Sequence, residues 1–307
     1  MKHIMYALSV TMMKVLVCMI VGFLLKKINI ITDAAVKSFS SLIFHVTAPC
    51  LLFSSIATMD GSELGNVVTL LYAGVAVYVV LMLLAVLITK LLRIPSDCAG
   101  VYKAALIFGN VSFLGIPLAQ SLYGDLGVFY IAILNIHFNL LFYTYGFYII
   151  TKGPKGGKFS LKSVVNAGVI GIVLAMIFFF FQIPLPDVVL QPISFVGSIT
   201  SPLSMIVIGC SIASYSLGTV FRQKKIYLMS LIRLLVYPIA AYFIFKFLLG
   251  DNLLTKVLSI YIGMPTASIV GMTAIAYDKD TQSAASCVAM TTIFSLVTIP
   301  ILYLIMT

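Results

Sequence analysis

The chain has 307 residues, of which 62% are hydrophobic and only 9% are charged. A soluble domain carries about 25% charged residues, so water is not the main solvent of this chain. Its formal charge of +10 comes from basic residues scattered between apolar stretches, a distribution that excludes a concentrated nucleic-acid-binding surface.

Apolar runs of about 20 residues, the length that crosses a bilayer, recur along the whole sequence. The short alternating strands of a membrane β-barrel would not give such continuous runs. The first run ends at Lys26-Lys27 without a small-residue cleavage pattern, which favours a retained span over a removed signal peptide. Ten spans are predicted, at about 5–25, 36–57, 66–89, 103–122, 127–150, 164–183, 189–213, 227–249, 255–276 and 284–306.

The distribution of Lys and Arg predicts the orientation of these spans. The loops after the odd-numbered spans and their flanks hold 14 basic residues, whereas the opposite side holds three. Because cytoplasmic loops carry the excess of Lys and Arg, both termini are predicted to lie on the extracytoplasmic side of the inner cell membrane. The Gly- and Lys-rich linker 151–162, at the midpoint of the chain, is then cytosolic.

The two halves of the chain share landmarks at nearly one spacing. Gly109 recurs 154 residues later as Gly263, and each is followed by a tyrosine after 14 residues. In span two, VTAPCLL around Pro49 resembles ITSPLSM around Pro202, at a spacing of 153 residues. This recurrence indicates an internal repeat of half the chain.

Five spans in each half is an odd number, so the second half enters the membrane from the opposite side. Inverted repeats of this kind are typical of secondary transporters. The predicted fold is therefore an all-α polytopic membrane protein of ten helices, with broken helices four and nine. The two five-helix repeats are residues 1–153 and 154–307.

Spans four and nine are interrupted at matching positions, by GNVSFLGIP from Gly109 and by GMPTAS from Gly263. Glycine and proline free backbone groups that lipid cannot satisfy, so such breaks are tolerated where they line a protein cavity. Paired breaks indicate the binding site of a transporter. A packing kink is the alternative for each span, because both residues are common in membrane helices.

Each break begins a half-helix whose unpaired N–H groups and dipole carry partial positive charge. Two half-helices that enter from opposite sides can direct these ends at one anion. No Asp or Glu lies inside a predicted span, which disfavours a cation carrier. The predicted substrate-binding residues are Gly109, Asn110, Ser112, Gly115, Pro117, Gly263, Pro265, Thr266 and Ser268.

Several further residues in the spans are candidates for accessory roles. Lys14 lies near the centre of span one without an acidic partner in that span, so it is a candidate for attracting the anion, with snorkelling as the alternative. His45 is either a proton-linked group or a hydrogen-bonded packing histidine. The matched prolines Pro49 and Pro202 complete the accessory set. Arg233, about two turns into span eight, is interpreted as a residue that snorkels to the cytosolic surface.

The residues that carry enzymatic or metal chemistry do not form a recognisable pattern. The five cysteines lack metal-ligand spacing and are interpreted as buried free thiols. Paired carboxylates, a nucleophile elbow and a phosphate loop are absent from the sequence. We therefore predict that the protein is not an enzyme and has no cofactor or bound metal.

The sequence resembles the auxin efflux carrier family, which contains bacterial permeases related to the plant auxin exporters. The resemblance covers the whole chain. It is carried by GNVSFLGIPL (109–118), GMPTASIVGMTAIAYD (263–278) and VTAPCLLF (46–53), which are similar to the family's segments in spans four, nine and two.

The resemblance implies a scaffold domain of spans one, two, six and seven and a transport domain of spans three to five and eight to ten. It also implies that broken spans four and nine cross, and that the solute is an organic anion such as auxin, malate, malonate or lactate. The plant exporters have an acidic residue in span three, whereas residues 66–89 here contain none. A coupling role for that acidic residue therefore does not transfer.

The predicted function is a secondary carrier of a small organic anion that works by an elevator-type, alternating-access movement. Asn110 would donate a hydrogen bond to the solute. The alternatives are a sodium-coupled symporter of the bile-acid type and a non-transporting membrane sensor or embedded enzyme. The predicted partners are the anion and the lipid bilayer, with a second copy of the chain as a candidate partner in a homodimer and no nucleic acid.

Overall fold

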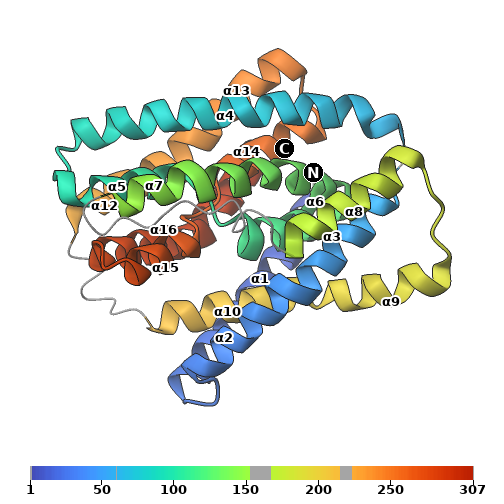
Figure 1. Ribbon diagram of the computed structural model, residues 1–307, viewed down its shortest axis with the longest axis horizontal. Helices are drawn as coiled ribbons and strands as arrows, with labels where there is room; N and C mark the ends of the chain where they lie inside the picture. Colours follow the sequence, from blue (N-terminus) through green and yellow to red (C-terminus); the bar gives the residue numbers. More distant parts are fainter. Residues whose placement is uncertain (1, 60, 153–166, 215–222, 307) are drawn as a thin grey trace. The chain divides into compact units, whose positions relative to one another are not determined.

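The computed structural model describes residues 2–59, 61–152, 167–214 and 223–306. Within these ranges the chain is helical almost throughout and contains no β-strand, which confirms the predicted all-helical class (Figure 1). The exception is an isolated antiparallel bridge between Gly109 and Thr266.

The first half of the chain contains α1 (Lys2–Lys27), α2 (Asp33–Leu42), η1 (Ile43–Thr47), α3 (Ala48–Ala57), η2 (Gly61–Glu63), α4 (Leu64–Leu91), α5 (Ser96–Ile107), η3 (Val111–Gly115), α6 (Ile116–Leu141), η4 (Phe142–Gly146) and α7 (Phe147–Thr151). The second half contains α8 (Ala167–Phe181), α9 (Asp187–Ser198), α10 (Thr200–Ser214), α12 (Lys224–Leu231), η6 (Ile232–Val236), α13 (Tyr237–Leu249), α14 (Leu253–Ile262), α15 (Ser268–Ala276) and α16 (Thr281–Ile305). Most of the η elements are single π-helical turns that continue directly into an α-helix.

Six helical segments in the described ranges are long and apolar enough to cross a membrane, so this is a multi-pass membrane protein. They are Asp33–Ala57, Gly61–Leu91, Val111–Thr151, Asp187–Ser214, Lys224–Leu249 and Thr281–Ile305. Each of the ten predicted ranges overlaps a helix, but the count of ten spans and the inverted repeat stay predictions.

The predicted boundary between spans four and five coincides with a break inside α6 (Ile116–Leu141). Gly124 lies within the expected separation at about 122–127 and is non-helical, with φ 63° and ψ −152°, so two helices meet there across a kink. Glycine adopts a positive φ without steric cost, which makes so short a turn possible.

Residues with a positive φ recur at similar spacings in the two halves. One member of each pair follows the first, third or fourth predicted span of the first half, and its partner follows the corresponding span of the second half. The pairs are Asn29 with Gln182, Arg93 with Gly250, and Gly124 with Asp278, which are 153, 157 and 154 residues apart. The matching positions of these positive-φ residues are consistent with the predicted repeats, which stay a prediction.

The chain divides into two compact units, each built from both halves of the sequence. Unit 1 contains Met1–Leu70, Ser112–Ile133 and Val165–Ser214, and unit 2 contains Leu71–Val111, Leu134–Val164 and Tyr215–Thr307. Spans one, two, six and seven thus share unit 1, as the family resemblance implies for a scaffold. The segment Ser112–Ile133 differs from that expectation, because it groups with unit 1 rather than with the rest of spans four and five.

In unit 1, α1 packs along α10, and α3 packs against α8 and α9 (Figure 1). The contact between α1 and α10 depends on two glycines. A Cβ atom on Gly22 would lie 2.1 Å from the carbonyl oxygen of Ile206, and one on Gly209 would lie 2.0 Å from that of Met19. Small residues let membrane helices approach closely, so this pair is held together by backbone packing.

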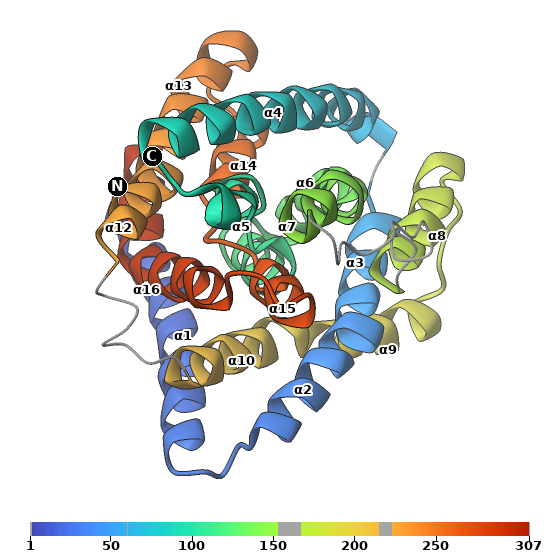
Figure 2. The same cartoon turned by 60° about the vertical axis from the view of Figure 1, so that its left-hand side comes forward.

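In unit 2, α16 packs against α5, α12 and α15, and α13 packs against α14 (Figure 2). The core of this unit is aromatic around Phe108, which is fully buried. Its ring meets those of Phe138 and Phe142 edge-to-face, with centroids 5.8 and 5.1 Å apart, and lies 5.9 Å from that of Tyr78. These rings fix the position at which α5 ends.

Candidate substrate site at the broken helices

Both interrupted spans of unit 2 lose helical structure where the sequence predicts it. Helix α5 ends at Ile107, and Phe108 is extended, with φ −98° and ψ 112°. Helix α14 ends at Ile262, and helical structure resumes in α15 at Ser268. Pro265 contributes to this second break, because proline has no N–H and disfavours a helical conformation in the preceding residue.

The two breaks are hydrogen-bonded to each other. The Asn110 N–H donates to the Pro265 carbonyl over 2.7 Å, and the Ala267 N–H donates to the Phe108 carbonyl over 3.0 Å. The freed backbone groups thus find partners within the protein, as they must in a membrane. We call residues 108–110 and 263–268 the crossover.

Thr266 connects the crossover to its surroundings. This residue is fully buried; its Oγ1 donates to the Ala105 carbonyl over 3.1 Å, and its N–H donates to Thr291 Oγ1 over 2.9 Å. Ala267, which has no side-chain hydroxyl, is the N-cap residue of α15. The Thr266 hydroxyl is directed to α5 and does not cap α15, and the part of Thr266 in substrate binding stays a prediction.

Asn110 and Ser268 are the polar side chains that face each other in the crossover. Asn110 is 4% exposed, and its Nδ2 lies 3.5 Å from Ser268 Oγ, the outer limit of a hydrogen bond. Ser268 is half-buried and is the first residue of α15, whose N-terminus has no side-chain cap. This arrangement places neutral hydrogen-bonding groups beside the positive end of a half-helix.

Arg233 is a residue of the site that the sequence analysis missed. It is 1% exposed, and its Nη1 donates to the Leu106 carbonyl at the end of α5. A Cβ atom on Gly109 would lie 2.9 Å from Arg233 Nη2. The interpretation of Arg233 as a snorkelling residue is therefore wrong. Its place within a helix can be read from the sequence, but the neighbours that bury it cannot.

Three predicted site residues lie on the continuation of span four into unit 1. Ser112 is half-buried in η3, whereas Gly115 and Pro117 are buried. Phe113 in the same turn packs edge-to-face on Phe44, with ring centroids 4.8 Å apart. The structure thus groups these three residues with unit 1, and their part in a substrate site stays a prediction.

The four accessory residues also belong to unit 1. Lys14 and Pro202 are exposed, and Pro49 is half-buried. The exposed ring of His45 is hydrogen-bonded through Nδ1 to the carbonyl of Ser41, one turn earlier, over 2.8 Å. His45 is thus tied to its own helix, and unit 2 contains none of these four residues.

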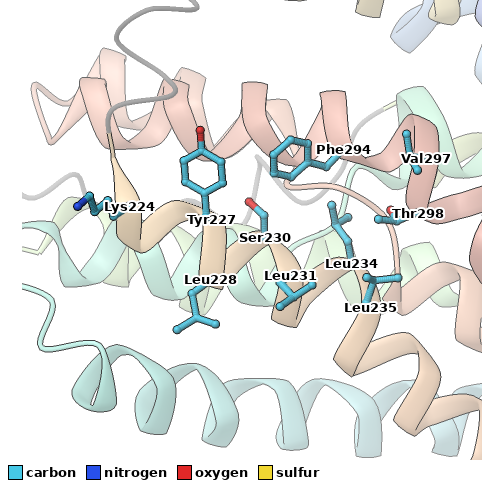
Figure 3. Close-up of a pocket in the computed structure, with 10 residues that line it drawn as sticks. All are labelled: Lys224, Tyr227, Leu228, Ser230, Leu231, Leu234, Leu235, Phe294, Val297 and Thr298. Atoms are coloured by element: carbon cyan, nitrogen blue, oxygen red, sulfur yellow. The ribbon is translucent and has the colours of Figure 1, made fainter.

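A groove of about 620 Å³ lies in unit 2 between α16 and the segment formed by α12 and η6 (Figure 3). Leu228, Leu231 and Val297 on its rim are exposed apolar side chains, which suits contact with lipid. Lys224 at one end is its charged group. It is lined by Lys224, Tyr227, Leu228, Ser230, Leu231, Leu234, Leu235, Phe294, Val297 and Thr298. A small carboxylate would find few polar partners there, so the crossover is the better candidate. The described residues contain no cluster of three or more His, Cys, Asp or Glu that could hold a metal.

The sequence profile described as membrane transport protein matches residues 7–303. The chain belongs to this family, which includes the auxin efflux carriers. The family is one of membrane transporters and not of enzymes. It is similar to an uncharacterized transporter of Methanocaldococcus jannaschii, with 24% identity over 93% of this chain and 94% of the relative. An uncharacterized transporter of Methanothermobacter thermautotrophicus is 24% identical over 95% of this chain and 96% of its own length.

Proposed function

We propose that this protein is a secondary transporter that carries a small organic anion, such as a carboxylate, across the cell membrane. Family membership supplies the general activity, and the crossover supports the class of solute. The observation that carries the proposal is the pairing of the two breaks through Asn110 and Pro265, beside the uncapped N-terminus of α15. Such a site suits an anion because the start of a half-helix presents backbone N–H groups that carry partial positive charge.

The polar groups of the crossover also favour an anion over a cation. Residues 108–110 and 263–268 contain no Asp or Glu. Of the acidic residues of unit 2, Asp97 lies in the first turn of α5, at the end away from the crossover, and Asp251, Asp278 and Asp280 lie between helices. A cation carrier would be expected to place a carboxylate within the membrane.

The proposed mechanism is alternating access by movement of unit 2 relative to unit 1. Each unit has its own packed interior, and the crossover residues all belong to unit 2. The hydrogen bonds between the breaks would keep the bound solute's contacts intact during the movement. In this mechanism the crossover is a preformed binding site that moves together with unit 2.

Uptake by the purified protein in liposomes tests the proposed function. The liposomes should accumulate radiolabelled lactate, malate, malonate or auxin faster than protein-free liposomes, with no dependence on sodium. Uptake that requires a sodium gradient would support the sodium-coupled alternative. Absence of carboxylate flux from folded protein would contradict the proposal.

The proposed orientation, with both termini outside, can be tested with two matched cysteines. Ser62 and Ser96 are both exposed and lie before and after α4 (Leu64–Leu91). In a variant without the native cysteines, a membrane-impermeant maleimide should label Ser62→Cys in intact cells. It should label Ser96→Cys only after permeabilisation, and the reverse pattern would contradict the orientation. Residues 153–162 of the predicted cytosolic linker lie outside the described ranges.

A further inference from the structure

Arg233 is a fully buried cation without an acidic partner in the described part of the chain. The residue is 1% exposed, and the ion pairs in the described ranges are formed by Lys26, Lys246 and Lys256 instead. A buried charge without a counter-ion costs several kcal/mol. Ionisable residues inside a membrane are therefore rare and usually functional.

The guanidinium lies at the negative end of a half-helix. Arg233 Nη1 donates to the carbonyl of Leu106, in the last turn of α5. The C-terminus of a helix carries partial negative charge on its unpaired carbonyls. Because α5 ends at the crossover, this charge would repel an anion bound there. The guanidinium of Arg233 places a full positive charge against this negative end of α5.

The other carbonyls at this end of α5 accept hydrogen bonds from neutral groups. Thr266 Oγ1 donates to the Ala105 carbonyl over 3.1 Å, and the Ala267 N–H donates to the Phe108 carbonyl over 3.0 Å. Neutral donors therefore suffice for satisfying carbonyls at this position. The charge of Arg233 is an addition that hydrogen bonding alone does not require.

Two buried polar atoms, one of Arg233 and one of a neighbouring tyrosine, lack a hydrogen-bond partner in the described part of the chain. Arg233 Nε and the Tyr237 hydroxyl are buried and have no hydrogen-bond partner within the described ranges. The two residues are four positions apart, so they lie on one face of the helix. A guanidinium retained only for packing would be expected to have its donors paired, because an unpaired buried donor is costly.

We propose that Arg233 is the positioning residue that makes the crossover selective for anions. Its charge offsets the negative end of α5, so that the positive N-terminus of α15 dominates the electrostatic potential at the site. This inference rests on the proposed function and adds the residue that sets the charge preference. Arg233 acts through α5 and is not assigned a contact with the solute.

The test compares a charged solute with an uncharged analogue in proteoliposomes. Half-saturating concentrations are measured for the carboxylate that is taken up fastest, and inhibition constants for its carboxamide. Arg233→Gln removes the charge and keeps an N–H donor on a shorter side chain, so it should weaken carboxylate binding about tenfold and leave carboxamide binding unchanged. The readout is the ratio of the carboxylate's half-saturating concentration to the carboxamide's inhibition constant. Arg233→Lys keeps the charge, so this ratio should stay near the wild-type value.

Lys246→Gln is the matched control, because Lys246 lies in the same span, Lys224–Leu249, in an exposed pair with Asp251. It should not change the ratio. If Arg233→Gln does not fold, Arg233→His gives the same test within one protein: acidification should selectively strengthen carboxylate binding as the imidazole becomes charged. An unchanged ratio in a folded variant would overturn the inference, even when wild-type carboxylate uptake upholds the proposed function. Absence of wild-type uptake would instead refute the proposed function.

Discussion

Gly109→Ala is expected to lower the maximal rate of solute uptake about tenfold or more while the protein stays folded. A Cβ atom at this position would lie 2.9 Å from Arg233 Nη2 and 3.0 Å from Met264 Cβ. Both neighbours are fully buried, so the bridge between Gly109 and Thr266 would have to open to make room. Overpacking of this kind costs about 1–3 kcal/mol, and about 1.4 kcal/mol corresponds to a tenfold change in rate.

Gly271→Ala is the control for this substitution, because it adds the same methyl group to the other broken span. The nearest atom to a Cβ on Gly271 is a methyl carbon of Val288 at 3.6 Å, an ordinary van der Waals contact. Uptake by this variant should match that of the wild type. Equal rates for the Gly109 and Gly271 variants would mean that the close packing of the crossover is unimportant for transport.

Asn110→Ala is expected to raise the half-saturating concentration about tenfold to hundredfold. Loss of a hydrogen bond to a charged group costs about 1.5–3 kcal/mol, which corresponds to that range of affinity. The Asn110 N–H would still donate to the Pro265 carbonyl, so the substitution should leave the crossover backbone intact. Asn110→Asp should weaken the uptake of anions further, because it places a like charge at the site.

The concentration dependence of initial uptake rates in proteoliposomes measures this effect. Asn139→Ala is the matched control, since Asn139 is also a buried asparagine of unit 2 and donates to the carbonyl of Asn135 one turn earlier over 2.8 Å. It should leave the half-saturating concentration unchanged. Normal uptake kinetics in the Asn110→Ala variant would mean that the break in span four is a packing kink and that the site assignment is wrong.

The helices of this protein could be predicted because lipid restricts the choice of structure. Long apolar runs with basic flanks predict helices, and the observed ends of α4 and α16 lie within a few residues of the expected ones. The boundary between spans four and five could be predicted as well, because Gly124 and its polar neighbour Asp125 are typical of a turn. The structure has a positive φ at Gly124, where two helices meet across a kink inside α6.

The paired breaks could also be predicted, since glycine and proline change the backbone locally and are visible in the sequence. Arg233 was misinterpreted, and the contacts of Thr266 were not predicted, for the opposite reason: both depend on partners that are distant in the sequence. Thr266 pairs with Ala105 and Thr291, and Arg233 pairs with Leu106. A single sequence shows the charge and the hydroxyl but not which carbonyl each will meet.

Protection of a cysteine by the solute would locate the binding site directly. Ser268→Cys, in a variant without the native cysteines, places a thiol at the start of α15 within reach of Asn110. In proteoliposomes, the transported carboxylate should slow alkylation of this thiol at concentrations near half-saturation of uptake. The carboxamide should protect less, and a cysteine at exposed Ser96 should react at the same rate with and without solute. Transport that saturates normally while alkylation of Ser268→Cys is unaffected by the carboxylate would contradict a solute site at the crossover.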